Sequence, residues 1–76
     1  MKPPSSHNLQ NQITVNGAAT RVPVDCTVQA LLGVLGMEGD RVAVALNRDV
    51  VPRSQFGSAA IAEGDRIEIL EAVGGG

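Results

Sequence analysis

The sequence has few of the residue types on which several kinds of site depend. Its 76 residues include a single cysteine, Cys26, a single aromatic residue, Phe56, and a single lysine, Lys2. One cysteine cannot form an internal disulfide or a zinc-ligand cluster, which favours a reducing compartment. A lone aromatic residue and a net charge of −2 disfavour a basic groove or a stacking platform for bases. We therefore expect no nucleic-acid partner and no metal site.

Long apolar runs are also absent. Nowhere do about 18 apolar residues follow one another, as a membrane-spanning helix requires, and the opening MKPPSSHN lacks the apolar run of a signal peptide. We expect a cytoplasmic protein with no membrane partner. Residues 1–12 are rich in Pro, Ser, Asn and Gln and show no hydrophobic periodicity, so a flexible extension is predicted there.

No set of residues suggests catalysis. His7 lies alone in the predicted extension, without a metal-ligand cluster or a nucleophile beside it. Most of the carboxylates near the end of the chain flank predicted turns or alternate outward on a predicted strand, the usual place for solvated charge: Glu63, Asp65, Glu68 and Glu71. The sequence therefore predicts a protein that is not an enzyme.

The patterned part of the chain begins at Ile13. In ITVNGAATRVPV, apolar and polar residues alternate on both sides of Asn16-Gly17, a dipeptide suited to a tight turn. We predict a hairpin whose second strand either lies at a sheet edge or ends at Pro23, because proline cannot donate a ladder hydrogen bond.

A helix of about three turns is predicted after the hairpin. Asp25 or Thr27 is placed to cap its start, and Gly36 is suited to a left-handed end. Its apolar stripe, which must face a sheet, consists of residues spaced at i, i+3, i+4 and i+7: Val28, Leu31, Leu32 and Leu35.

Three further strands are predicted. In RVAVALN, larger apolar residues alternate with the small residues Ala43 and Ala45. The small side chains suit either a face covered by a packed element or an exposed outer face. VVPRSQF begins with a short strand that Pro52 ends, and RIEILEAV forms the last strand. Phe56 and Ile61 are expected to fill the core beneath the crossing between these two.

One helix of this length covers only one face of a four- or five-stranded sheet. For the first and last strands to share the hydrophobic centre of that sheet, they must be parallel neighbours. This is the ubiquitin-like β-grasp, an α+β fold with a mixed sheet. We assign residues 13–72 to this domain and residues 73–76 to a flexible C-terminal glycine tail.

Three segments resemble a known family. VALNRDVVPRSQF followed by EGDRIEILEAVGGG is similar to the ThiS family, the sulfur carriers of thiamin biosynthesis, and TVQALLGVLG resembles the family's helix. The resemblance runs from the first hairpin to the last residue. It implies that an E1-like adenylating enzyme uses ATP and Mg²⁺ to activate the carboxylate of Gly76. A sulfur donor such as a cysteine desulfurase then yields a thiocarboxylate, which thiazole synthase consumes.

The glycine run and its surroundings supply the remaining candidate site residues. Because glycine has no Cβ atom, Gly74 and Gly75 suit a backbone that threads a narrow channel. Arg53 is a candidate for partner docking but also suits plain surface. Leu70 and Ala72, which depart from the inward alternation, suit either an exposed docking contact or burial against a loop.

Two other functions share this fold and glycine ending. One is the small subunit of molybdopterin synthase, whose family tends to have aromatic and proline residues before the diglycine, where this chain has ILEAVGGG. The other is a ubiquitin-like protein modifier. The only lysine is Lys2, so chains built on the folded body are excluded, although attachment to other proteins is not.

Overall fold

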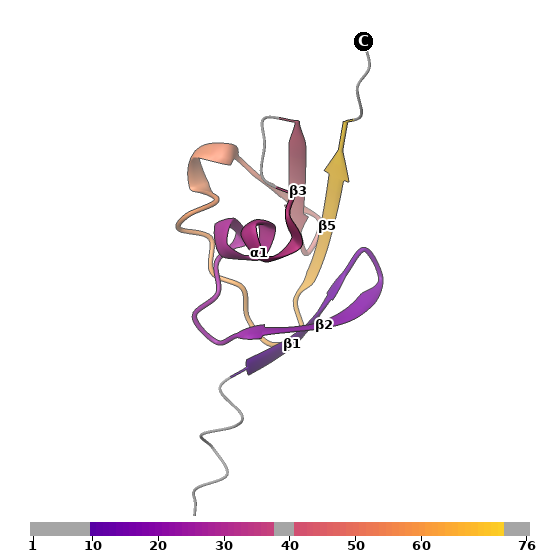
Figure 1. The fold of residues 1–76 in the computed structure, drawn as a ribbon, viewed down its shortest axis with the longest axis vertical. Helices are drawn as coiled ribbons and strands as arrows, with labels where there is room; N and C mark the ends of the chain where they lie inside the picture. Colours follow the sequence, from indigo (N-terminus) through magenta and orange to yellow (C-terminus); the bar gives the residue numbers. More distant parts are fainter. Residues whose placement is uncertain (1–9, 38–40, 73–76) are drawn as a thin grey trace, which may run out of the picture.

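The computed structural model describes residues 10–37 and 41–72. These form β1 (Gln10–Val15), β2 (Ala18–Pro23), α1 (Val28–Leu35), β3 (Val42–Leu46), β4 (Asp49–Val51), the short 3-10 helix η2 (Arg53–Gln55) and β5 (Arg66–Glu71). The strands make one five-stranded sheet in the order β2-β1-β5-β3-β4, and α1 crosses one of its faces (Figure 1). The predicted β-grasp fold is confirmed.

The first hairpin is built on a turn that needs two left-handed residues. Asn16 has φ 50° and Gly17 has φ 86°, the signs that a tight turn between right-twisted strands requires. Pairing runs from Val15↔Ala18 back to Gln10↔Pro23, and β2 lies at the sheet edge, one of the two predicted possibilities.

The sheet begins earlier in the chain than the sequence pattern suggested. Residues 10–12 pair with residues 21–23, although they are polar and show no alternation. The predicted extension over residues 1–12 is therefore wrong for its last three residues, because backbone hydrogen bonds to β2 hold them without an apolar side chain. Residues 1–9 lie outside the described residues.

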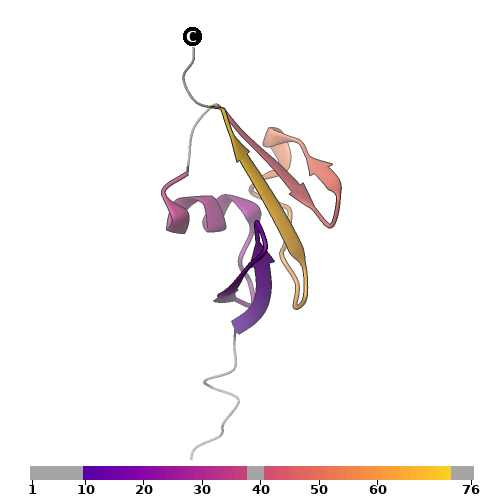
Figure 2. The same ribbon diagram turned by 90° about the vertical axis from the view of Figure 1, so that its right-hand side faces the viewer.

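The last strand occupies the centre of the sheet. β5 pairs in parallel with β1 at Thr14↔Arg66 and Val15↔Ile67, which confirms the predicted neighbours. On its other side β5 is antiparallel to β3, from Val42↔Glu71 to Leu46↔Ile67. Figure 2 shows β5 running the length of the sheet.

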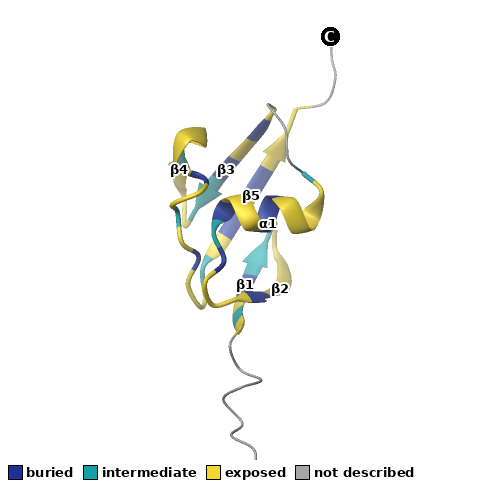
Figure 3. Cartoon of the chain, turned by 60° about the vertical axis from the view of Figure 1, so that its left-hand side comes forward, coloured by how far each residue is buried: buried dark blue, intermediate teal, exposed yellow. Residues whose placement is uncertain are grey.

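The helix is shorter than predicted. It spans eight residues, about two turns instead of three. The Thr27 hydroxyl accepts a hydrogen bond from the Ala30 amide, so Thr27 and not Asp25 is the cap, and Gly36 ends the helix with φ 70°. Leu35 is 38% exposed, because the last turn of α1 reaches past the strands (Figures 2 and 3). The predicted apolar stripe is thus buried only as far as Leu32.

One core lies between α1 and the inner face of the sheet. Phe56 and Ile61 belong to this core, as predicted, because the segment between β4 and β5 is hydrogen-bonded to the start of α1. The Ile61 amide donates to the Cys26 carbonyl at 3.0 Å, and the Gln29 amide donates to the Phe56 carbonyl at 2.9 Å. Among the described residues, the buried side chains are Ile13, Val22, Cys26, Val28, Leu31, Leu32, Val42, Val44, Phe56, Ile61, Ile67 and Ile69.

Candidate functional site

The candidate site is the end of β5 and the surface around it. Figure 1 shows β5, in yellow, pointing out of the body toward the C-terminal end of the chain. The strand is held as far as Ala72, whose amide donates to the Arg41 carbonyl at 2.9 Å. Gly74, Gly75 and Gly76 lie outside the described residues, so the structure describes the base from which the glycine run continues.

Alternation along β5 divides its side chains between the two faces of the sheet. Ile67 and Ile69 are buried beneath α1, whereas Glu68 and Leu70 point to the outer face. Leu70 is 73% exposed, and Ala72 is exposed as well. Of the two predicted environments for this pair, the structure shows exposure and not burial against a loop.

Leu70 borders a shallow groove on the outer face. Ala43 pairs with Leu70 across β3 and β5, and Ala45 pairs with both Glu68 and Val50. The two small alanine side chains leave a hollow of about 510 Å³ between Leu70 and Val50. We call it the outer-face groove; it is lined by Asn16, Ala43, Val44, Ala45, Val50, Glu68, Ile69 and Leu70.

Val50 was missed by the sequence prediction of docking residues. It is 76% exposed and lies across β3 from Leu70, so the apolar surface is wider than a Leu70–Ala72 pair. The available signal was the alternation of Ala43 and Ala45, which suits an outer face with little side-chain cover. That signal did not show which strand lies beyond β3.

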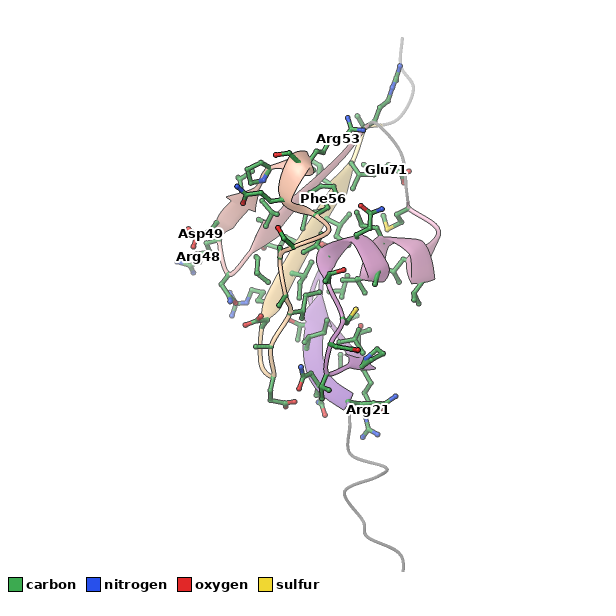
Figure 4. All side chains as sticks on the ribbon, turned by 90° about the vertical axis from the view of Figure 1, so that its left-hand side faces the viewer. Arg21, Arg48, Asp49, Arg53, Phe56 and Glu71 are labelled. Carbon is green, nitrogen blue, oxygen red and sulfur yellow. The ribbon has the colours of Figure 1, made fainter. Side chains whose placement is uncertain are left out.

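The structure does not place the three predicted docking residues in one patch. Arg53 lies on η2, at the same end of the molecule as Glu71 (Figure 4). It is exposed, but neither Arg53 nor Ala72 lines the outer-face groove. Leu70 therefore belongs to the groove, whereas Arg53 belongs to the rim near the end of β5.

Two of the carboxylates that were expected to be solvated accept hydrogen bonds from backbone amides. The Glu63 carboxylate accepts from the Gln12 amide at 2.8 Å, and the Asp65 carboxylate accepts from the Ala62 amide at 2.7 Å. They flank Gly64, whose φ of 83° makes the turn that leads into β5. These carboxylates fix the start of β5.

Cys26 lies in the core and not at the candidate site. Its side chain is 4% exposed, and its thiol donates to the Thr27 carbonyl at 3.4 Å. Burial, and secondarily the negative charge of Asp25, raise the pKa of the Cys26 thiol. The neutral thiol is therefore a poor nucleophile.

The fold and the course of β5 define a ubiquitin-like β-grasp domain whose central strand leads into a glycine run. No helix in residues 10–37 and 41–72 has the length and apolarity needed to cross a bilayer. The ThiS family model matches residues 10–76, and the chain belongs to the ThiS family.

Named relatives agree with this family. The sulfur carrier protein ThiS of Escherichia coli (strain K12) is 32% identical over 65 residues, which cover 86% of this chain and 98% of that protein. The crystal structure of the thiamine biosynthesis protein ThiS from Geobacter metallireducens superposes with a TM-score of 0.73 at 34% identity, covering 86% of this chain and 99% of that one. The predicted family and fold are confirmed.

A second kind of relative is much longer. A thiazole synthase of Paramagnetospirillum magneticum is 38% identical over 65 residues, and one of Magnetococcus marinus is 35% identical over 65 residues. The aligned stretch covers 86% of this chain but only 20% of each of those proteins. This chain thus corresponds to about a fifth of their length.

Proposed function

We propose that this chain is a sulfur carrier whose Gly76 carboxylate is converted to a thiocarboxylate that supplies sulfur for thiazole formation in thiamin biosynthesis. The ThiS-family match over residues 10–76, which includes the glycine run, carries this proposal. It favours thiamin biosynthesis over the molybdopterin and protein-modifier functions.

The chemistry requires activation, because a carboxylate is a poor electrophile. An E1-like partner transfers AMP from ATP to the Gly76 carboxylate, with Mg²⁺ bound to the nucleotide, and pyrophosphate leaves. The persulfide sulfur of a donor such as a cysteine desulfurase then attacks the acyl carbon and forms the C–S bond as AMP leaves. A thiol reduces the resulting acyl disulfide, which releases the thiocarboxylate and leaves the thiol oxidised to a disulfide. Gly74 and Gly75 suit this role because a backbone without Cβ atoms enters a narrow channel readily.

The outer-face groove is the proposed docking surface for the partner enzymes. It adjoins the end of β5, so a protein seated on Leu70 and Val50 lies close to the start of the glycine run. Exposed aliphatic side chains around a hollow suit an apolar side chain of the partner. Arg53 and Ala72, nearer the end of the strand, are proposed to contact the rim of that partner.

A thiazole synthase is the proposed acceptor of the sulfur. Two proteins named thiazole synthase each contain a stretch similar to this chain. A carrier-like segment within the chain of a thiazole synthase supports direct contact between the two activities, because a covalent link raises the effective concentration of one for the other.

ATP–pyrophosphate exchange and intact-protein mass spectrometry test this function. With a thiamin-type activating enzyme, the wild-type chain is expected to support exchange. With the sulfur donor present it should gain the mass that replacement of one oxygen by sulfur requires. A variant lacking Gly76 is the control and should show neither. Absence of carrier-dependent exchange with every such enzyme tested would refute the proposal.

A further inference from the structure

Asn16 makes contacts that its role in the hairpin turn does not require. Its backbone amide donates to the Ile67 carbonyl at 2.8 Å, in continuation of the β1–β5 ladder. Its side chain reaches two residues further along β5: Oδ1 accepts from the Ile69 amide at 2.8 Å, and Nδ2 donates to the Ile69 carbonyl at 3.2 Å. Both backbone groups of Ile69 are therefore bound by one side chain.

This side chain replaces a missing residue of β1. The register of β1 against β5 ends at Val15↔Ile67, because the chain turns away at Asn16 and Gly17. A carboxamide carries one donor side and one acceptor, as a peptide group does. The Asn16 amide thus adds one further rung to the parallel ladder, on the side of β5 that β1 has already left.

The added rung lies where β5 approaches the glycine run. Ile69 is followed by Leu70, which borders the outer-face groove, and Asn16 itself lines that groove. The opposite side of β5 is held by β3 as far as Glu71. With Asn16 in place, β5 is held on its β1 side at Ile69 as well as on its β3 side, and this fixes the part of the strand that borders the outer-face groove.

We propose that Asn16 is a positioning residue for activation of the chain end: its amide fixes β5 at Ile69, beside the outer-face groove, and so holds the end of β5 in one orientation relative to an enzyme docked there. This inference rests on the proposed function. An enzyme docked on the groove then receives the carboxylate in one orientation, and fewer conformations have to be searched after docking.

Asn47 provides a matched control at the other end of β5. Like Asn16, it has a positive φ, 52° against 50°, at the first position of a tight turn. Its Oδ1 accepts from the Arg66 backbone amide at 2.9 Å, its Nδ2 donates to the Asp65 carboxylate at 2.9 Å, and its backbone amide donates to the Arg66 carbonyl at 2.8 Å. Arg66 begins β5, whereas Ile69 lies near its end.

The test compares Asn16→Gly with Asn47→Gly. Glycine accepts positive φ without strain, so each variant loses side-chain hydrogen bonds while its turn is retained. Amide hydrogen exchange measured by NMR should accelerate at least about tenfold at Ile69 in Asn16→Gly, and at Arg66 in Asn47→Gly. Unchanged exchange at Ile69 in Asn16→Gly would overturn the positioning role.

Kinetics separate positioning from general stability. In ATP–pyrophosphate exchange at varied carrier concentration, Asn16→Gly should lower kcat, which reports the step after docking, about five- to tenfold. Asn47→Gly should leave kcat and KM within about twofold. Equal kcat values for the two variants would overturn the proposal. If even the wild-type chain is not adenylated, the proposed function is refuted and the positioning role with it.

Discussion

At the scale of single residues, the surroundings of a side chain decide whether its chemistry is available. Cys26 has the most reactive kind of side chain in the sequence, but its thiol is buried and its pKa is raised by desolvation and by Asp25. Leu70 has an inert side chain, yet its exposure beside the groove makes it available to a partner.

Cys26→Ala is expected to leave sulfur transfer intact, because the sulfur is proposed to travel on Gly76. Stability should fall by about 1 kcal/mol, since a small buried group is lost from the core. Thiocarboxylate formation and thermal unfolding check the two expectations. Loss of sulfur transfer in a folded Cys26→Ala protein would make the thiol part of the transfer.

Alkylation with iodoacetamide tests the state of the Cys26 thiol. Because the pKa is raised in the folded state, the thiol should stay neutral and react slowly near pH 7, and quickly once urea unfolds the chain. The sign of the shift means that the thiol's stabilising contribution is present at neutral pH and is lost as alkaline pH passes the folded-state pKa. Equal alkylation rates in folded and unfolded protein would contradict this.

Leu70→Thr tests the proposed docking surface. Threonine suits a strand but removes most of the apolar bulk, so stability should change by less than about 0.5 kcal/mol while KM for the activating enzyme rises about tenfold. Val34→Thr is the control, because Val34 is 78% exposed on α1 and does not line the groove. A KM that rises equally in both variants would contradict docking on the outer face.

At the scale of elements, the two tight turns compare directly because both begin with asparagine. The first continues with Gly17 at φ 86°, and the second continues with Arg48 at φ 75°. A left-handed conformation suits glycine but costs an arginine about 1 kcal/mol or more. The β3–β4 turn therefore has a less suitable residue at its second position than the β1–β2 turn.

Arg48→Gly should raise the free energy of unfolding by about 0.5–1 kcal/mol, because the strain at φ 75° is relieved. The reverse change at the matched position, Gly17→Ala, should lower it by a similar amount. A Cβ atom at Gly17 meets nothing within 4 Å, so the cost there comes from the backbone conformation alone. Urea unfolding of both variants measures the two effects, and stabilisation by Gly17→Ala would refute the argument.

At the scale of the whole molecule, we propose separate roles for the folded body and the glycine run. The buried side chains of the described residues lie between Ile13 and Ile69, before the glycine run begins. The proposed chemistry takes place on Gly76. Stability and activity should therefore be separable by changes at the end of the chain.

Deletion of Gly75 and Gly76 should leave thermal unfolding nearly unchanged, since no core side chain is removed, and should abolish adenylation. Gly75→Val retains the carboxylate of Gly76 but adds a β-branched side chain that restricts the backbone and fills space in a channel suited to glycine. We expect it to compete with the wild type for the activating enzyme but to be adenylated poorly. Adenylation of Gly75→Val at the wild-type rate would show that steric passage does not explain the glycines.

Features that depend only on neighbouring residues could be predicted from the sequence. Asn16-Gly17 predicted a turn because both positions tolerate left-handed backbone, Thr27 was a candidate cap for the helix, and alternation placed Ile67 and Ile69 on one face. These are short-range preferences of the backbone and of side-chain periodicity. The family resemblance supplied the role of Gly76, which lies outside the described residues.

Only the tertiary structure decided which distant residues meet. The order of the strands brings Val50 across β3 from Leu70 and so creates the groove. The last turn of α1 reaches past the strands and leaves Leu35 partly exposed. Polar residues 10–12 join the sheet by pairing with residues 21–23, without an apolar side chain. The Asn16–Ile69 contact joins residues 53 positions apart. Such contacts depend on strand register and sheet order, which local preferences do not specify.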